Sequence, residues 1–134
     1  MKISTYKPIP PADVFKPKDF IKNYQTITKA TDKLLLFAAD QKIEHMHDDF
    51  TSKDFPSEIS NPEHFFKIAN AGNVGAFATQ FGLISRYGKN YPDIPYIVKL
   101  NSKTNLISTK EQDSYSALLW DVSDVVELKK KSKL

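Results

Sequence analysis

Four polar residues of this chain stand at the ends of apolar segments, where they could act on a substrate. Asp40 directly follows the run LLLFAA, and Lys99 interrupts the run YIVKL. A positioned carboxylate can exchange protons with a substrate, and an ammonium group can stabilise negative charge that develops in a reaction. Gln80 and Asn101 close the second and third segments, and their amides could bind substrate hydroxyls or only hold loops in place. We take Asp40 and Lys99 as catalytic candidates and Gln80 and Asn101 as substrate-binding candidates.

The two catalytic candidates also have structural interpretations. Asp40 could cap the turn after its strand, and Lys99 could extend its amine to solvent from an edge strand. A lysine between Val98 and Leu100 is nevertheless unfavourable to bury unless it is paired or used, and an acid directly after a buried strand lies where α/β folds hold their active sites. We therefore favour a functional role for both. Glu44 is expected to organise the following loop and not to take part in the chemistry.

The segments that carry these residues are predicted to form a parallel sheet. Residues 34–39, 74–80 and 96–101 are largely apolar, without the polar alternation of a half-exposed strand. Strands of this kind are covered by helices on both faces. The carboxyl ends of parallel strands meet at one edge of a sheet, so the four candidate residues are expected at that edge.

Helices are predicted after each strand. Asn61, Pro62 and Gly72 mark the N-cap, the first turn and the end of the first helix. A shorter helix is expected over residues 83–88, and Asp121 is expected to cap a third helix that has an acidic first turn and a basic last turn. The buried face of the first helix is expected to hold Phe65, Ile68 and Ala69. The order β-α-β-α-β-α indicates an α/β fold with right-handed crossovers.

A further helix is expected ahead of the first strand, over residues 16–28, with Phe20, Tyr24 and Ile27 on one face. A helix in this place often covers the amino-terminal end of a barrel. Three β/α units fall short of a complete barrel, which takes about 250 residues. The fold class expected is α/β, an incomplete (β/α)8 TIM barrel made of its first three parallel β/α units with an N-terminal helix. Its strands are expected in the order 1-2-3, with helices on one outer side and a bare inner face where strands four to eight would close the barrel. Residues 1–134 are expected to be the N-terminal part of one such domain.

Composition narrows the classes of function. The 134 residues, 40% of them hydrophobic, allow one modest core. No apolar run approaches the roughly 20 residues that span a bilayer, and the amino terminus does not resemble a signal peptide. The lack of cysteine excludes disulfides and thiolate nucleophiles and fits a reducing cytoplasm. The net charge is +3, and the lysines of residues 129–133 suit a helix end better than a nucleic-acid tail. Neither a membrane nor a nucleic acid is expected as a partner.

Three longer stretches carry a family resemblance: FAADQKIEHMHDDF, NPEHFFKIANAGNVGAFATQFGLISRYG and PYIVKLNSKTNL. They closely resemble the amino-terminal half of archaeal-type class I fructose-bisphosphate aldolases, which are relatives of the DeoC/LacD-like (β/α)8 aldolases. The resemblance runs from about Ile9 to Leu134. Its specific part is the combination of DQKxEH after the first strand with VKLNSKTN after the third.

The resemblance implies a lyase that cleaves fructose 1,6-bisphosphate to dihydroxyacetone phosphate and glyceraldehyde 3-phosphate through a Schiff base, with no cofactor. The family's Schiff-base lysine stands on the sixth strand, so it is expected beyond Leu134, and the chain alone is expected to be inactive. Asp40 matches an aspartate that lines the family's pocket, and Lys99 occupies the place of a third-strand lysine that points into the mouth of related barrels. The implied partners are a phosphorylated sugar and, for the complete enzyme, further copies in a homo-oligomer.

Two other classes of function stay open. His45 and His47, followed by Asp48 and Asp49, resemble the H-x-H pair that binds a metal ion in metal-dependent barrel hydrolases. On a strand, such a pair places both imidazoles on one side, because alternate residues point to the same side. The pair lies several residues past the strand end, and the remaining histidine, His64, falls within the first predicted helix, so a third ligand is missing from the pattern. The chain could also be a non-catalytic half-barrel that pairs its open strand edges with a second half.

Overall fold

Three parallel strands form the sheet that carries the candidate residues. β1 (Leu36–Ala38), β2 (Ala76–Gln80) and β3 (Tyr96–Lys99) lie in the order β1-β2-β3, as predicted. Their register places Gln80 of β2 directly opposite Lys99 of β3. All three strands are shorter than the predicted segments. The computed structural model describes residues 9, 10, 12, 15–44, 52–102 and 116–132.

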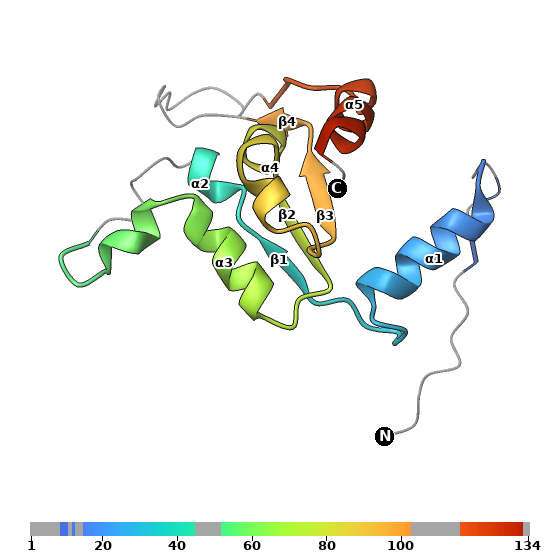
Figure 1. Cartoon of the computed structure of the whole chain (residues 1–134), viewed down its shortest axis with the longest axis horizontal. Coiled ribbons are helices and arrows are strands. Elements are labelled where there is room, and N and C mark those ends of the chain that lie inside the picture. The colour runs from blue at the N-terminus through green and yellow to red at the C-terminus, as the bar shows by residue number, and fades with distance from the viewer. Residues whose placement is uncertain (1–8, 11, 13–14, 45–51, 103–115, 133–134) are drawn as a thin grey trace, which may run out of the picture.

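Two helices cover one face of this sheet. α3 (Glu63–Ala71) precedes β2, and α4 (Phe81–Tyr87) follows it. In Figure 1, α4 lies in front of β2 and α3 lies beside β1. The predicted start of α3 is confirmed, because Asn61 Oδ1 accepts a hydrogen bond of 3.0 Å from the backbone N–H of Glu63. α4 begins two residues earlier than predicted and continues into the short 3₁₀ helix η2 (Gly88–Asn90).

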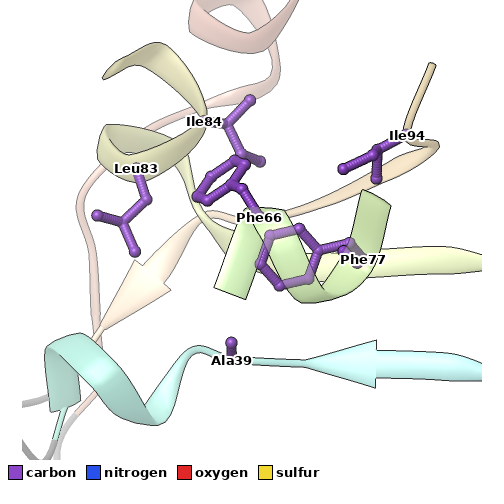
Figure 2. Close-up of a cluster of buried hydrophobic side chains, with 7 residues drawn as sticks. Ala39, Phe66, Phe77, Leu83, Ile84 and Ile94 are labelled. Carbon is purple, nitrogen blue, oxygen red and sulfur yellow. The ribbon is translucent and has the colours of Figure 1, made fainter. Parts of the chain in front are cut away.

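The hydrophobic core lies between these helices and the sheet. Phe66 of α3 and Phe77 of β2 are completely buried, and their rings meet edge to face, with centroids 5.0 Å apart. Figure 2 shows the ring of Phe66 between Phe77 and Ile84 of α4. The predicted face of α3 was partly wrong: Ala69 is buried, but Ile68 is 41% exposed and Phe66 takes its place. Turning the helix toward Phe66 buries the larger apolar side chain.

The opposite face of the sheet is open in the described part of the chain. Leu36 of β1 and Ile97 of β3 are 45% and 41% exposed. Between them stand two small residues in register, Ala38 and Ala78, and Ala78 lies opposite Ile97. Helices thus cover one face among the described residues, as predicted for the first three units of an incomplete barrel. Because side chains alternate along a strand, the polar residues two positions further on belong to this open face.

The helix ahead of the sheet meets the start of β2. α1 (Pro17–Ile27) closely matches its prediction, and Figure 1 shows it at the end of the sheet where β1 begins. Its last turn contacts Gly75: a Cβ built on this glycine would lie 1.9 Å from the carbonyl oxygen of Ile27 and 2.9 Å from Leu34 Cδ1. Only glycine fits here without a shift of the backbone.

Gly75→Ala is therefore expected to lower the free energy of unfolding of the complete protein by about 2 kcal/mol, the usual effect of overpacking a close backbone contact. Urea denaturation followed by circular dichroism measures it. Gly82→Ala is the matched control, because a Cβ on Gly82 would meet nothing within 4 Å. Equal stability of the two variants would contradict the close contact between α1 and β2.

An unpredicted pair of short strands follows β3. β4 (Asn101–Ser102) pairs antiparallel with β5 (Ala117–Leu118), and Asn101 lies opposite Leu118. The prediction that Asn101 ends the third strand was therefore wrong, because the parallel pairing stops at Lys99 and Asn101 belongs to a separate sheet. The apolar pattern resumes at Leu100 after Lys99, so it did not mark the point where the parallel pairing ends.

The remaining helices complete the described chain. α5 (Val122–Ser132) is capped by Asp121 as predicted: Asp121 Oδ1 accepts from the N–H of Asp124 at 3.0 Å, and Asp124 Oδ2 accepts from the N–H of Asp121 at 2.8 Å. α2 (Gln41–Glu44) follows β1, and the 3₁₀ helix η1 (Ser57–Ser60) precedes α3.

None of the helices within the described ranges is long and apolar enough to cross a membrane.

Candidate active site

Asp40 and Lys99 meet at the carboxyl edge of the sheet. Asp40 follows β1, and Lys99 is the last residue of β3. The ammonium Nζ of Lys99 donates a hydrogen bond of 2.7 Å to Asp40 Oδ2, and each side chain is 25% exposed. Both catalytic candidates thus lie where parallel α/β folds bind their substrates, and the structure brings them into direct contact.

Glu44, which the sequence led us to assign to loop organisation, is the third member of this cluster. Lys99 Nζ donates a second hydrogen bond, of 2.5 Å, to Glu44 Oε1, and the Glu44 side chain is only 8% exposed. α2 begins directly after Asp40, and the N–H of Glu44 donates to the carbonyl oxygen of Asp40 at 3.3 Å. Residues four apart share one side of a helical turn, so the spacing of Asp40 and Glu44 was the signal that could have revealed this pair.

Gln80 holds the end of β1 in place. Its Nε2 donates a hydrogen bond of 2.8 Å to the carbonyl oxygen of Asp40, and the residue is buried. The neighbouring Thr79 hydroxyl lies 3.4 Å from Gln80 Oε1. Of the two roles considered for Gln80, the described contacts match the structural one, since its amide nitrogen bonds the backbone that carries Asp40.

A pocket of about 170 Å³ opens beside Lys99. Asn101, an exposed residue of β4, lines it together with Gln80 and Lys99. One wall is aromatic, since Trp120 stacks on Phe81 with ring centroids 4.3 Å apart. The complete lining consists of Gln80, Gly82, Leu83, Lys99, Asn101, Ser102, Leu119 and Trp120. Three of the four residues singled out from the sequence therefore border one pocket, and the fourth, Asp40, is bonded to its lysine.

The electrostatics of the cluster keep Lys99 and Asp40 charged. Burial favours the neutral amine of Lys99, but the hydrogen bonds and negative charges of Asp40 and Glu44 outweigh it, and the pKa of Lys99 is raised. Burial likewise disfavours the carboxylate of Asp40, but the hydrogen bond and charge of Lys99 outweigh it, and the pKa of Asp40 is lowered. A lysine that attacks a carbonyl must be neutral. In this state Lys99 suits the stabilisation of negative charge and not nucleophilic attack.

The alternative metal site falls largely outside the described residues. His45, His47, Asp48 and Asp49 lie in the range 45–51, which the structure does not describe. Within the described ranges, no group of three or more histidine, aspartate or glutamate side chains is arranged to hold a metal ion. His64 lies on α3, with its ring centroid 6.4 Å from that of Phe65.

Known proteins share both the sequence and the fold of this chain. A fructose-bisphosphate aldolase/6-deoxy-5-ketofructose 1-phosphate synthase of Methanocaldococcus jannaschii is 50% identical over 119 residues, which are 89% of this chain and 38% of that protein. The structure of a fructose-bisphosphate aldolase from Slackia heliotrinireducens matches with a TM-score of 0.84 and 44% identity, over 91% of this chain and 39% of its own. The chain thus spans about two fifths of the length of these relatives.

A more distant structure carries chemical information. It is an archaeal fructose-1,6-bisphosphate aldolase with its catalytic lysine covalently bound to the carbinolamine intermediate of the substrate, similar with a TM-score of 0.60 and 27% identity over 80% of this chain and 39% of its own. These neighbours are TIM-barrel aldolases, so the β/α units described above correspond to part of such a barrel. The model of the DeoC/LacD family of aldolases matches residues 34–132. The chain belongs to the DeoC/LacD family of aldolases.

Proposed function

We propose that this chain is the N-terminal part of the single TIM-barrel domain of a class I fructose-bisphosphate aldolase. The complete enzyme would cleave fructose 1,6-bisphosphate to dihydroxyacetone phosphate and glyceraldehyde 3-phosphate. The observation that carries this proposal is the cluster of Asp40, Glu44 and Lys99 at the carboxyl edge of the sheet. In TIM-barrel enzymes this edge holds the active site, and the similar proteins named above are fructose-bisphosphate aldolases.

The proposed chemistry needs a neutral lysine, an electron sink and an acid–base group. A lysine amine from the part of the barrel outside these 134 residues attacks the ketose carbonyl and, with loss of water, forms an iminium ion. The iminium accepts the electron pair released when the carbon–carbon bond breaks, and a base takes the proton of the hydroxyl that becomes the aldehyde. We assign this proton exchange to Asp40, which is ionised and lies at the carboxyl edge of the sheet beside Lys99.

The other candidates have supporting roles in the proposed site. The Lys99 ammonium would attract substrate phosphate or keep the nearby Schiff-base amine neutral by charge repulsion. Asn101 borders the pocket and can bind a substrate hydroxyl. Gln80 was a substrate-binding candidate, but its bond to the Asp40 carbonyl supports a role in aligning Asp40.

Reduction with borohydride tests the proposal. The complete enzyme is incubated with fructose 1,6-bisphosphate and then reduced, which converts a Schiff base into a stable secondary amine that mass spectrometry locates. We expect one covalent adduct and cleavage that a chelator does not affect. Absence of the adduct, together with loss of cleavage in the chelator, would favour the metal-dependent alternative that uses His45 and His47. Absence of both the adduct and any cleavage would refute the aldolase proposal.

We further propose that the complete enzyme is a cytoplasmic homo-oligomer. The cysteine-free sequence suits a reducing compartment, and symmetric self-association is common among soluble enzymes. Size-exclusion chromatography with light scattering measures the number of copies, and a monomeric enzyme would contradict the oligomer.

A further inference from the structure

The buried carboxylate of Glu44 has no role in the chemistry proposed above. Its side chain is 8% exposed and its Oε1 lies 2.5 Å from Lys99 Nζ. A carboxylate in such surroundings is unfavourable unless it is paired. Asp40, at 2.7 Å, would already neutralise the charge of Lys99. The lysine therefore faces two carboxylates where one would suffice for an ion pair.

The two carboxylates reach Lys99 from a single helical turn. The carbonyl oxygen of Asp40 accepts hydrogen bonds from the N–H of Glu44 at 3.3 Å, which closes the turn, and from Gln80 Nε2 at 2.8 Å, which holds the start of the turn against β2. β2 presents the neutral Gln80 to Lys99, and β4 lines the adjoining pocket with the neutral Asn101. Among the described residues, Asp40 and Glu44 are thus the charged groups that contact the ammonium.

We propose that Glu44 is a positioning residue, which holds the Lys99 ammonium at the mouth of the site and in its charged form while Asp40 serves the substrate. An ammonium group has three N–H donors. Among the described residues, Glu44 and Asp40 accept two of them, and we assign the third to the substrate. When Asp40 takes up a proton during the reaction, Glu44 still balances the charge of Lys99. This inference rests on the proposed aldolase function for its catalytic consequence.

The proposal makes a signed prediction for pH dependence. Loss of the negative charge of Glu44 removes one of the groups that raise the pKa of Lys99, so the ammonium should lose its proton at lower pH. If the charged form is the active one, the basic limb of the pH profile of kcat/KM moves to lower pH in Glu44→Gln. Burial opposes the ionisation of Asp40, but the hydrogen bond and charge of Lys99, which the variant retains, keep the pKa of Asp40 lowered, so the acidic limb should not move to higher pH.

Reductive methylation reports on Lys99 without any need for catalysis. Formaldehyde with cyanoborohydride modifies only the neutral amine, and peptide mass spectrometry measures the rate at Lys99 in the complete enzyme at fixed pH. Glu44→Gln is expected to raise this rate about tenfold, since a nearby opposite charge commonly shifts a pKa by a unit or more. The matched control is Glu58→Gln, which makes the same chemical change on an exposed residue of η1. The control should methylate Lys99 at the wild-type rate.

Two results would overturn the positioning role. One is an unchanged methylation rate at Lys99 in Glu44→Gln, and the other is a faster rate with an unmoved basic limb. Glu44→Asp keeps the charge but withdraws the carboxylate by one methylene, so it should give intermediate values and replaces Glu44→Gln if that variant does not fold. A wild-type enzyme without fructose-bisphosphate cleavage would refute the proposed function, whereas the methylation rates would still decide whether Glu44 holds Lys99 charged.

Discussion

Asp40→Asn is expected to lower the turnover of the complete enzyme about a hundredfold or more, as loss of a positioned acid–base group does. The substitution keeps the size of the side chain but removes its negative charge and its ability to take up a proton. The fold should persist, because Gln80 bonds the backbone carbonyl of residue 40 and not its side chain. Lys99 also retains its contact with Glu44. The loss should therefore fall on kcat more than on stability.

Steady-state cleavage of fructose 1,6-bisphosphate, measured by a coupled assay, gives the turnover of this variant. Asp54→Asn is its matched control, since Asp54 is exposed and follows no strand of the sheet. Thermal unfolding of both variants separates a catalytic effect from a folding effect. Near-normal turnover in Asp40→Asn would reduce Asp40 to a residue of the turn.

A polypeptide limited to residues 1–134 is expected to show no cleavage at all. The lysine that lines its described pocket, Lys99, is held protonated by two carboxylates and cannot act as the nucleophile. The proposed Schiff-base lysine belongs to the remainder of the barrel. Within the described residues, the outer edges of β1 and β3 have no partner strand in their sheet, and Leu36 and Ile97 lie exposed on its open face. Such edges and apolar surfaces favour self-association.

The measurement combines a coupled cleavage assay with light scattering at several protein concentrations. The complete enzyme at the same molar concentration is the positive control. A monodisperse monomer that cleaves fructose 1,6-bisphosphate at a measurable rate would contradict both the half-barrel interpretation and the assignment of the nucleophile to another part of the protein.

Much of the fold could be predicted because the local sequence signals, helix caps and apolar runs, agreed with the tertiary packing. Asn61 and Asp121 cap the helices that they were expected to cap, and three apolar runs gave three parallel strands in the predicted order. The errors arose where packing decided between local alternatives. Periodicity could not tell whether Phe66 or Ile68 faces the sheet, and the pairing of β4 with β5 depends on residues that are far apart in the chain.

The site was predictable as a location and less so as a set of contacts. Asp40 and Lys99 were found because each contrasts with apolar neighbours. Glu44 was assigned to loop organisation because a glutamate after a strand end resembles an ordinary solvated loop residue. Only the helical turn of α2 directs it back toward Lys99. Gln80 was ambiguous for the same reason: its sequence position is shared by residues that bind ligands and residues that bind backbone.

The apolar strand residues below the charged cluster affect the electric field of the site. One layer below Asp40, Gln80 and Lys99, the open face of the sheet carries Ala38, Ala78 and Ile97 in register. Methyl groups are poorly polarisable and offer no counter-charge, so they cannot screen the ions from below. The potential of the cluster is then focused outward through the pocket mouth. The cluster holds two carboxylates and one ammonium, so its net charge is −1, and a polar residue at position 38 or 78 would screen that charge.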